Sequence, residues 1–299
     1  MIKSIKRRFI LVALVALTFG SLTACNNGNA ILAALLGPFN LTAFPVALTG
    51  FGTNGFGNMT LDRNGDLIIV GGFATTNLYT IARADGALTI LPITGTAGTL
   101  LSVVDTGTVV YVSTSTGGIY SVDTGTGAAT LLATVGNNVP ALAVAPAGFG
   151  AFGGQLIAGD HNTGDVNAVD AGGTVTFIAT VANLTNLAFA ADGTLYVTDD
   201  GAGNLSTVTA AGVVAVFAVG LADADGIAID NAGGRIFVLS PSVGINSVAV
   251  PGGAVTFVNN LYSLDNGWFP TGAFFDAPGG DLFVQTRTNP DSTIETFKP

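Results

Sequence analysis

Short apolar runs alternate with polar turn residues along most of this chain, and the alternation repeats about every 40 residues. Each copy has an apolar strand, a tight turn that contains Gly, and a second apolar strand. The clearest copy is LTNLAFAADGTLYVTDDG from Leu184, and related copies begin near Asn58, Leu100, Ala141, Gly226 and Gly272. A repeat of this length is typical of solenoids, propellers and arrays, in which each unit needs its neighbours to bury its apolar surface.

Each copy predicts four strands. In the first copy these are Met59–Asp62, Leu67–Val70, Leu78–Arg83 and Leu88–Ile93. Asn-Gly and Asp-Gly pairs in this copy favour hairpin turns, because Gly tolerates positive φ. The first strand of most copies is apolar on both sides, which is expected where both faces of a sheet are buried. Four-stranded units of this size arranged radially form a β-propeller.

The number of strands predicts how the ring closes. The last copy supplies only three strands, Ala273–Asp276, Leu282–Gln285 and Thr293–Phe297. The unassigned strand Thr42–Thr49 is therefore expected to complete this copy and to remove the exposed edges of an open array. The predicted fold is an all-β, six-bladed propeller over residues 42–299. A β-solenoid is the alternative, although its coils require a shorter period.

Residues 1–24 have the anatomy of a secretion signal, with a basic start followed by the apolar stretch Phe9–Phe19, which is too short to span a bilayer. A retained membrane helix is the alternative. Leu22-Thr23-Ala24-Cys25 resembles the lipobox of bacterial lipoproteins, which implies that Cys25 becomes the lipidated N-terminus and contacts the bilayer. Residues 25–41 then form a tether. Asn26 after the cysteine implies the outer membrane, on its periplasmic side or surface, if the source is Gram-negative.

Composition narrows the range of functions. The net charge is −10, and removal of the four basic and no acidic residues of 1–24 takes it to −14. Phosphate backbones are bound by clustered Lys and Arg, so nucleic-acid binding is not expected. Cys25 is the only cysteine and His161 the only histidine, which excludes internal disulfides and multi-histidine zinc sites. The acidity fits either plain solubility or the binding of cations.

Acidic residues cluster where strands end. In a propeller the first strand of each blade begins on the face where the second strand ends. This rule predicts one rim for Asp160, His161, Asp199, Asp200, Asp223 and Asp225. Carboxylates facing one cavity hold Ca²⁺ well, so Asp225, Asp199 and Asp160 are candidate metal ligands. The alternative is that they are turn residues, which Asp favours in any protein.

The loop 259–271 is longer than its counterparts and contains Tyr262, Trp268 and Phe269. Aromatic side chains at a propeller mouth stack on sugars or form partner hot spots, so Trp268 and Tyr262, with Asp200, are candidate ligand-binding residues. The alternative is that the aromatic residues pack down to cap the loop.

The stretches TNLAFAADGTLYVTDD and ADGIAIDNAGGRIFV carry a family resemblance. With the other repeats, they resemble the six-bladed propellers of the NHL and gluconolactonase (senescence-marker-like) superfamily. In its lactonases a Glu, two Asn and an Asp at the starts of inner strands hold one divalent metal. Asp225 falls on the family Asp and Asn186 lies one position beyond a family Asn, but the Glu has no equivalent. One matching ligand of four favours a non-catalytic protein.

Two functions of different classes follow. The first is a lipid-anchored propeller of the cell envelope that binds a protein or small-molecule ligand at the mouth bearing Asp225, Asp199 and Trp268, with no required cofactor. The alternative is a metal-dependent lactone or ester hydrolase with a divergent site. It would use Asp225 with Asp199 or Asp200, and His161 as base. A purely structural envelope component is a third interpretation.

Overall fold

The structure is a computed structural model of the whole chain. It describes residues 46–48, 57–71, 76–259, 273–276, 280–288 and 291–297. Within this part, no helix is long and apolar enough to span a membrane. Residues 1–45 lie outside the described part, and with them the expected signal, lipidated cysteine and tether.

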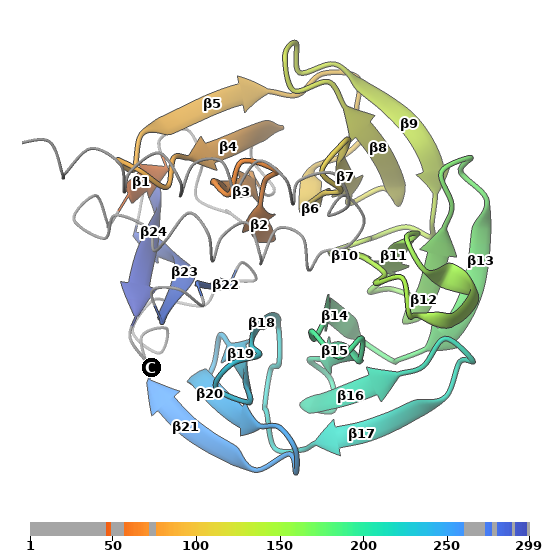
Figure 1. Cartoon of the computed structure of the whole chain (residues 1–299), viewed down its shortest axis with the longest axis vertical. Helices are drawn as coiled ribbons and strands as arrows, with labels where there is room; N and C mark the ends of the chain where they lie inside the picture. Colours follow the sequence, from red (N-terminus) through yellow and green to blue (C-terminus); the bar gives the residue numbers. More distant parts are fainter. Residues whose placement is uncertain are drawn as a thin grey trace, which may run out of the picture.

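Five blades radiate from a common centre, each an antiparallel sheet of four consecutive strands (Figure 1). Blade one is β2(Met59–Leu61), β3(Leu67–Val70), β4(Asn77–Ile81) and β5(Leu88–Pro92). Blade two is β6(Leu100–Asp105), β7(Val110–Thr114), β8(Gly118–Val122) and β9(Ala129–Thr134). Blade three is β10(Ala141–Val144), β11(Leu156–Gly159), β12(Asp165–Val169) and β13(Val175–Thr180), with the 3₁₀ turn η2(Gly150–Phe152) between its first two strands. Blade four is β14(Leu184–Phe189), β15(Leu195–Asp199), β16(Asn204–Val208) and β17(Val214–Ala218). Blade five is β18(Gly226–Asp230), β19(Arg235–Ser240), β20(Gly244–Ala249) and β21(Val255–Asn259).

A further sheet combines strands from the two ends of the described chain. It contains β22(Ala273–Asp276), β23(Asp281–Thr288) and β24(Asp291–Phe297), with β1(Val46–Leu48) beside β24. Val46 is the register partner of Ile294. The prediction of an all-β propeller is therefore confirmed. Five blades are each formed from one continuous stretch of sequence. Of the expected closing strand, only residues 46–48 are described, so the count of six blades and the closure of the ring stay predictions.

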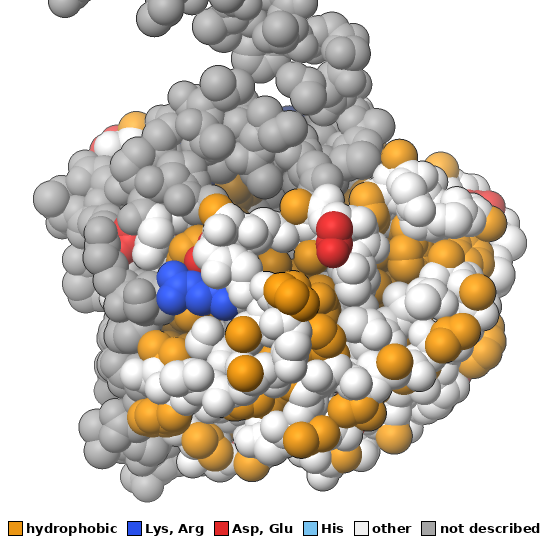
Figure 2. Space-filling model, turned by 60° about the horizontal axis from the view of Figure 1, so that its bottom comes forward, with side chains coloured by type: hydrophobic (Ala, Val, Ile, Leu, Met, Phe, Trp, Pro, Cys, Tyr) orange, Lys and Arg blue, Asp and Glu red, His pale blue; other side chains and the backbone are white. Residues whose placement is uncertain are grey.

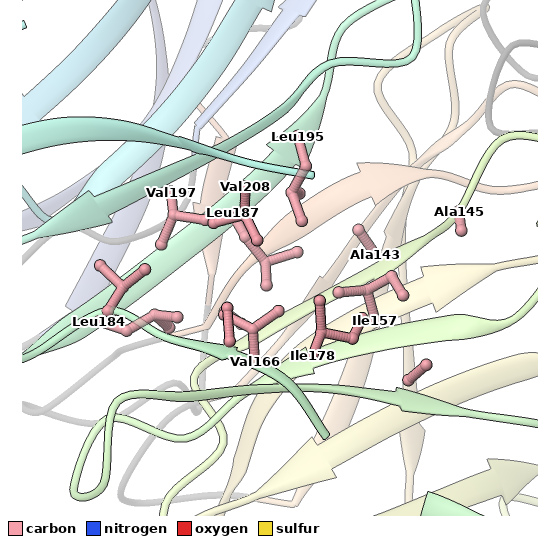
Figure 3. Close-up of a cluster of buried hydrophobic side chains, with 14 of the residues drawn as sticks. Ala143, Ala145, Ile157, Val166, Ile178, Leu184, Leu187, Leu195, Val197 and Val208 are labelled. Atoms are coloured by element: carbon pink, nitrogen blue, oxygen red, sulfur yellow. The ribbon is translucent and has the colours of Figure 1, made fainter. Parts of the chain in front are cut away.

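The core lies between blades. Inner strands such as β10 are buried along their whole length, because each sheet is covered by a neighbour on both faces. Figure 3 shows one such cluster, where Ile157 and Val166 of blade three meet Leu187, Leu195 and Val197 of blade four. Small residues such as Ala143 in the same cluster allow the two sheets to approach closely.

Glycines in the turns between third and fourth strands fit against the preceding blade. Gly173 has φ +85°, and a Cβ added to it would lie 2.3 Å from the carbonyl oxygen of Leu132 in β9. The same contact joins Gly127 to Pro92, Gly212 to Ile178 and Gly253 to Phe217. Because both the φ and the close approach exclude a side chain, these positions require Gly.

The outermost strands form a wall without charge. None of β5, β9, β13, β17 and β21 contains Asp, Glu, Lys or Arg. Each exposes a large apolar side chain at a corresponding register position, namely Ile90, Leu131, Phe177, Val216 and Phe257. Figure 2 shows such a face, coloured mostly orange and white with few charged groups. Register shifts interrupt the pairing of four of these strands, and such bulges twist an edge away from intermolecular pairing.

Candidate functional site

The rim is defined here as the end of the blades where first strands begin and second strands end. The structure brings the predicted residues of blades three to five together there. Asp200 interacts electrostatically with His161, Asp223 and Asp199. Asp225 in turn interacts with Asp200 and Asp223. The prediction of a shared acidic rim is therefore confirmed for these five side chains.

Asp225 occupies an irregular position just before β18. Its backbone N–H donates to the carbonyl of Leu239 at 2.9 Å, although the register partner of Leu239 is Gly226. Two residues of the first strand thus face one residue of the second, as in a β-bulge. Blades two and four have register shifts at the same place, between Leu100 and Ser102 and between Leu184 and Asn186. Bulges redirect side chains next to functional sites, and this one sets the position of Asp225.

The carboxyl group of Asp225 is buried without a compensating contact. The residue is 6% exposed, and within the described part of the chain its side chain makes no hydrogen bond or ion pair. Burial raises the pKa of Asp225 well above its usual value, and repulsion from Asp200 and Asp223 raises it further. Burial also raises the pKa of Asp200, while attraction to His161 opposes this change. A buried carboxyl of this kind is a functional-site candidate.

Asp223 reinforces the unusual character of this loop. Its φ is +62°, a left-handed value that non-glycine residues adopt infrequently, although Asp tolerates it better than most. Asn183 has φ +52° in the corresponding loop of blade four, where its carbonyl accepts the N–H of Asp200 at 3.3 Å. Two left-handed residues therefore shape the loops on which the acidic side chains lie.

Two threonines of blade four hold the backbone around Asp225. Thr185 Oγ1 donates to the carbonyl of Ala224 at 2.7 Å, and Thr198 Oγ1 lies 3.0 Å from the carbonyl of Asp225. The two hydroxyls are also 3.0 Å apart. Both residues are buried. The backbone at Asp225 is thus positioned by the neighbouring blade before any ligand arrives.

The residue at the end of the second strand has the same role in blades two to four. Thr114 Oγ1 accepts the N–H of Gly118 at 3.1 Å. Asp160 accepts the N–H groups of Asn162 and Asn137, at 2.8 and 2.9 Å. Asp199 accepts the N–H of Ala202 at 2.6 Å. These side chains hold turns, as the alternative interpretation of Asp160 and Asp199 proposed.

Blade five departs from this pattern. Its second strand ends at Ser240, which is fully buried, and the Ser240 hydroxyl has no hydrogen-bond partner in the described structure. A buried hydroxyl without a partner is infrequent and costs free energy. Asp225 donates its N–H to the residue next to Ser240, so both unpartnered groups lie at the same end of blade five.

His161 connects blade three to blade four. Its Nδ1 lies 2.9 Å from the carbonyl of Leu184. Because a carbonyl only accepts, Nδ1 carries the proton, and Nε2 is the remaining acceptor of the neutral ring.

A second polar group lies where inner strands converge. Asn58 Nδ2 is 3.3 Å from Asn186 Oδ1 and 3.4 Å from Ser102 Oγ. These residues belong to or adjoin the first strands of blades one, four and two. The family resemblance alone indicated Asn186, and no pattern in the sequence predicted its contact with Asn58 or the contact of Asn58 with Ser102. Their polar side chains in otherwise apolar inner strands are the signal that identifies them.

Among the described residues, no group of three or more His, Cys, Asp or Glu side chains is placed to hold a metal ion. Backbone N–H groups donate to the carboxylates of Asp160 and Asp199, and the assignment of Asp225, Asp199 and Asp160 as joint ligands stays a prediction. Of the ligand set that the gluconolactonase resemblance implies, the Glu has no equivalent in this sequence and Asp225 is the one residue that falls on a ligand position. Tyr262 and Trp268 lie outside the described residues.

Comparison with known proteins shows the fold alone. No family model matches the chain, and no curated protein matches it. Virginiamycin B lyase from Staphylococcus aureus is 15% identical with a TM-score of 0.59, over 85% of this chain and 87% of that chain. An auxiliary nutrient binding protein from Bacteroides thetaiotaomicron is 14% identical with a TM-score of 0.63, over 82% and 70%. The calcium-binding protein regucalcin from Agrobacterium tumefaciens is 21% identical with a TM-score of 0.58, over 87% and 94%.

Proposed function

We propose that this chain is a lipid-anchored β-propeller of the cell envelope that binds a ligand at its rim and catalyses no reaction. The observation that supports binding is the Asp225 carboxyl, which is buried without a hydrogen bond within the described chain and whose backbone is held by Thr185 and Thr198. A preorganised polar group without a partner is costly to maintain, and a ligand repays that cost.

The anchor and the closed ring belong to the same proposal. The lipobox-like sequence at Cys25 supports lipid attachment, and the pairing of β1 with β24 supports a six-bladed ring that the N-terminal strand closes. The anchor is tested by expressing the unaltered chain and a Cys25→Ala variant in a bacterium grown with labelled palmitate. We expect label in the unaltered chain and none in the variant. Equal labelling of both would refute the anchor at Cys25.

Binding is favoured over hydrolysis by the donor set. A metal-dependent hydrolase uses a metal ion to polarise its substrate or activate water, and no described group of acidic or histidine side chains is placed to hold one. Activity of the full chain against a panel of lactones and aryl esters, with Ca²⁺, Zn²⁺ or Mn²⁺ added, would reverse this preference.

A thermal-shift screen tests the binding face. The unaltered chain is screened against sugars, amino acids and short peptides, beside an Asp225→Asn/Asp200→Asn variant. We expect every stabilising compound to lose its effect in that variant. Asp192→Asn is the matched control, because Asp192 is exposed in a hairpin turn at the opposite end of blade four. Compounds that stabilise both the double variant and the unaltered chain equally would move the site away from this rim.

A further inference from the structure

Two unpartnered polar side chains, Asp225 and Ser240, lie at the rim end of blade five. Asp225 is 6% exposed and Ser240 is 0% exposed, and neither side chain has a hydrogen-bond partner among the described residues. One offers carboxylate oxygens and the other a hydroxyl oxygen, so this end of blade five supplies acceptors. In the equivalent positions of blade four, Thr185 donates to the carbonyl of Ala224 and Asp199 accepts the N–H of Ala202.

The charged side chains around Asp225 are mainly acidic. Asp200 and Asp223 both repel Asp225. Among the described side chains, His161 is the one basic group that interacts with these carboxyl groups, through its attraction to Asp200. Three arginines of the described chain are engaged elsewhere, in ion pairs between Arg63 and Asp105, Arg83 and Asp276, and Arg235 and Asp230. These three guanidinium groups are not among the groups that interact with Asp200 and Asp225.

We propose that the buried Asp225 carboxyl, with Ser240 at the same end of blade five, binds the primary ammonium group of an organic ligand, an inference that rests on the binding function proposed above. An ammonium has three donors and no acceptor, which matches carboxylate and hydroxyl oxygens. Its positive charge is also attracted by the carboxyl groups of Asp225, Asp200 and Asp223. A bare divalent ion fits less well, because it requires several ligands at short distance and no described cluster provides them.

Putrescine is the probe for this proposal, titrated into the full chain by isothermal calorimetry at constant ionic strength. We expect saturable binding that weakens by roughly tenfold or more in Asp225→Asn, since a charge-assisted hydrogen bond is lost. Ser240→Ala is expected to weaken binding by a smaller factor, of about three. This second variant guards against misfolding, because removing an unpartnered buried hydroxyl does not destabilise the fold.

Two controls distinguish a requirement for ligand charge from a requirement for ligand shape. They also test ammonium binding separately from the general binding function proposed above. We expect no binding of 1,4-butanediol, which has the length of putrescine without its charge, and unchanged putrescine affinity in Asp192→Asn. Equal affinity in Asp225→Asn would overturn the proposal. Absence of putrescine binding would also overturn it, as would Asp225-dependent binding of CaCl₂ alone. Each of these three results leaves the general binding function supported if uncharged compounds still stabilise the unaltered chain but not the Asp225→Asn/Asp200→Asn variant.

Discussion

The side-chain amide of Asn58, at the start of blade one, lies 3.3 Å from the side-chain oxygen of Asn186 in blade four. These residues are 128 positions apart in sequence. The contact connects two first strands that share no sheet, so it fixes the relative position of separate blades. Asn186 is 1% exposed, and burial makes its hydrogen bonds costly to lose.

Replacement of Asn186 by Ala is expected to lower the free energy of unfolding by about 1–3 kcal/mol, because it leaves buried polar groups of its neighbours unsatisfied. Urea denaturation of Asn186→Ala, Asn58→Ala and the double variant measures the coupling. Since the two amides contact each other, the double variant should lose less than the sum of the single losses. Additive losses would show that the contact does not contribute.

The contribution of Asp225 to the pH dependence of stability should have the opposite sign to that of most carboxyl groups. Its pKa is raised in the folded protein by burial, so the folded state binds more protons than the unfolded state at intermediate pH. The stabilising contribution is present below the unfolded pKa of about 3.9 and is lost as the pH rises through the folded pKa. Asp225→Asn is therefore expected to raise the melting temperature at neutral pH, by roughly 2–4 °C for each kcal/mol gained.

Asp170→Asn provides the opposite control for that measurement. The backbone N–H of Thr174 is the main cause that lowers the pKa of Asp170, which lies in an exposed turn. Its contribution to stability is present above the unfolded pKa and is lost as the pH falls. Thermal melts between pH 4 and pH 8 should show Asp170→Asn no more stable than the unaltered chain. A melting temperature of Asp225→Asn below that of the unaltered chain at every pH would contradict the assignment.

Thr198 is expected to support Asp225 through its hydroxyl and not through its shape. Thr198→Val keeps the side-chain volume but removes the hydroxyl that lies 3.0 Å from the Asp225 carbonyl, at an expected cost of about 1–3 kcal/mol in urea denaturation. Thr198→Ser keeps the hydroxyl and loses a methyl group. Putrescine affinity should fall in the Val variant and remain in the Ser variant. Equal affinity in both would assign no positioning role to this hydroxyl.

The turn glycines allow steric contact and backbone strain to be separated. Gly173→Ala combines a left-handed φ of +85° with a clash against the Leu132 carbonyl. Gly107→Ala has a φ of +86° with no other atom within 4 Å of its added methyl group. We expect Gly107→Ala to cost about 1 kcal/mol and Gly173→Ala to cost more, in the range of about 2–4 kcal/mol. Similar midpoints in urea would show that the blades separate easily at this contact.

The sequence predicted the parts of the fold that depend on local pattern. Alternating apolar runs and Gly turns placed the strands of the five continuous blades, because both signals act within a few residues. The rim was predicted for the same reason, since strand direction alone determines which ends meet. The roles of Asp160 and Asp199 could not be predicted. Whether a carboxylate holds a turn or faces a ligand depends on one or two backbone N–H groups that sequence spacing does not locate.

The unpartnered state of Ser240 and the contact made by Asn58 also could not be predicted from local sequence pattern. Ser240 resembles any strand-end Ser, and its buried, unpartnered state emerges only when its equivalents Thr114, Asp160 and Asp199 are compared in three dimensions. Asn58 meets a residue three blades away, and no periodicity within one repeat encodes that distance.

The uncharged outer strands make repulsion between molecules depend on direction. Two copies that approach face to face meet acidic turns, whereas two copies that approach wall to wall meet Leu131, Phe177, Val216 and similar side chains. The sequence isoelectric point is about 4.1, so acidification removes the repulsion at the faces while the wall is unchanged. In concentrated solution near that pH, lateral clustering in the plane of the disc should precede disordered precipitation.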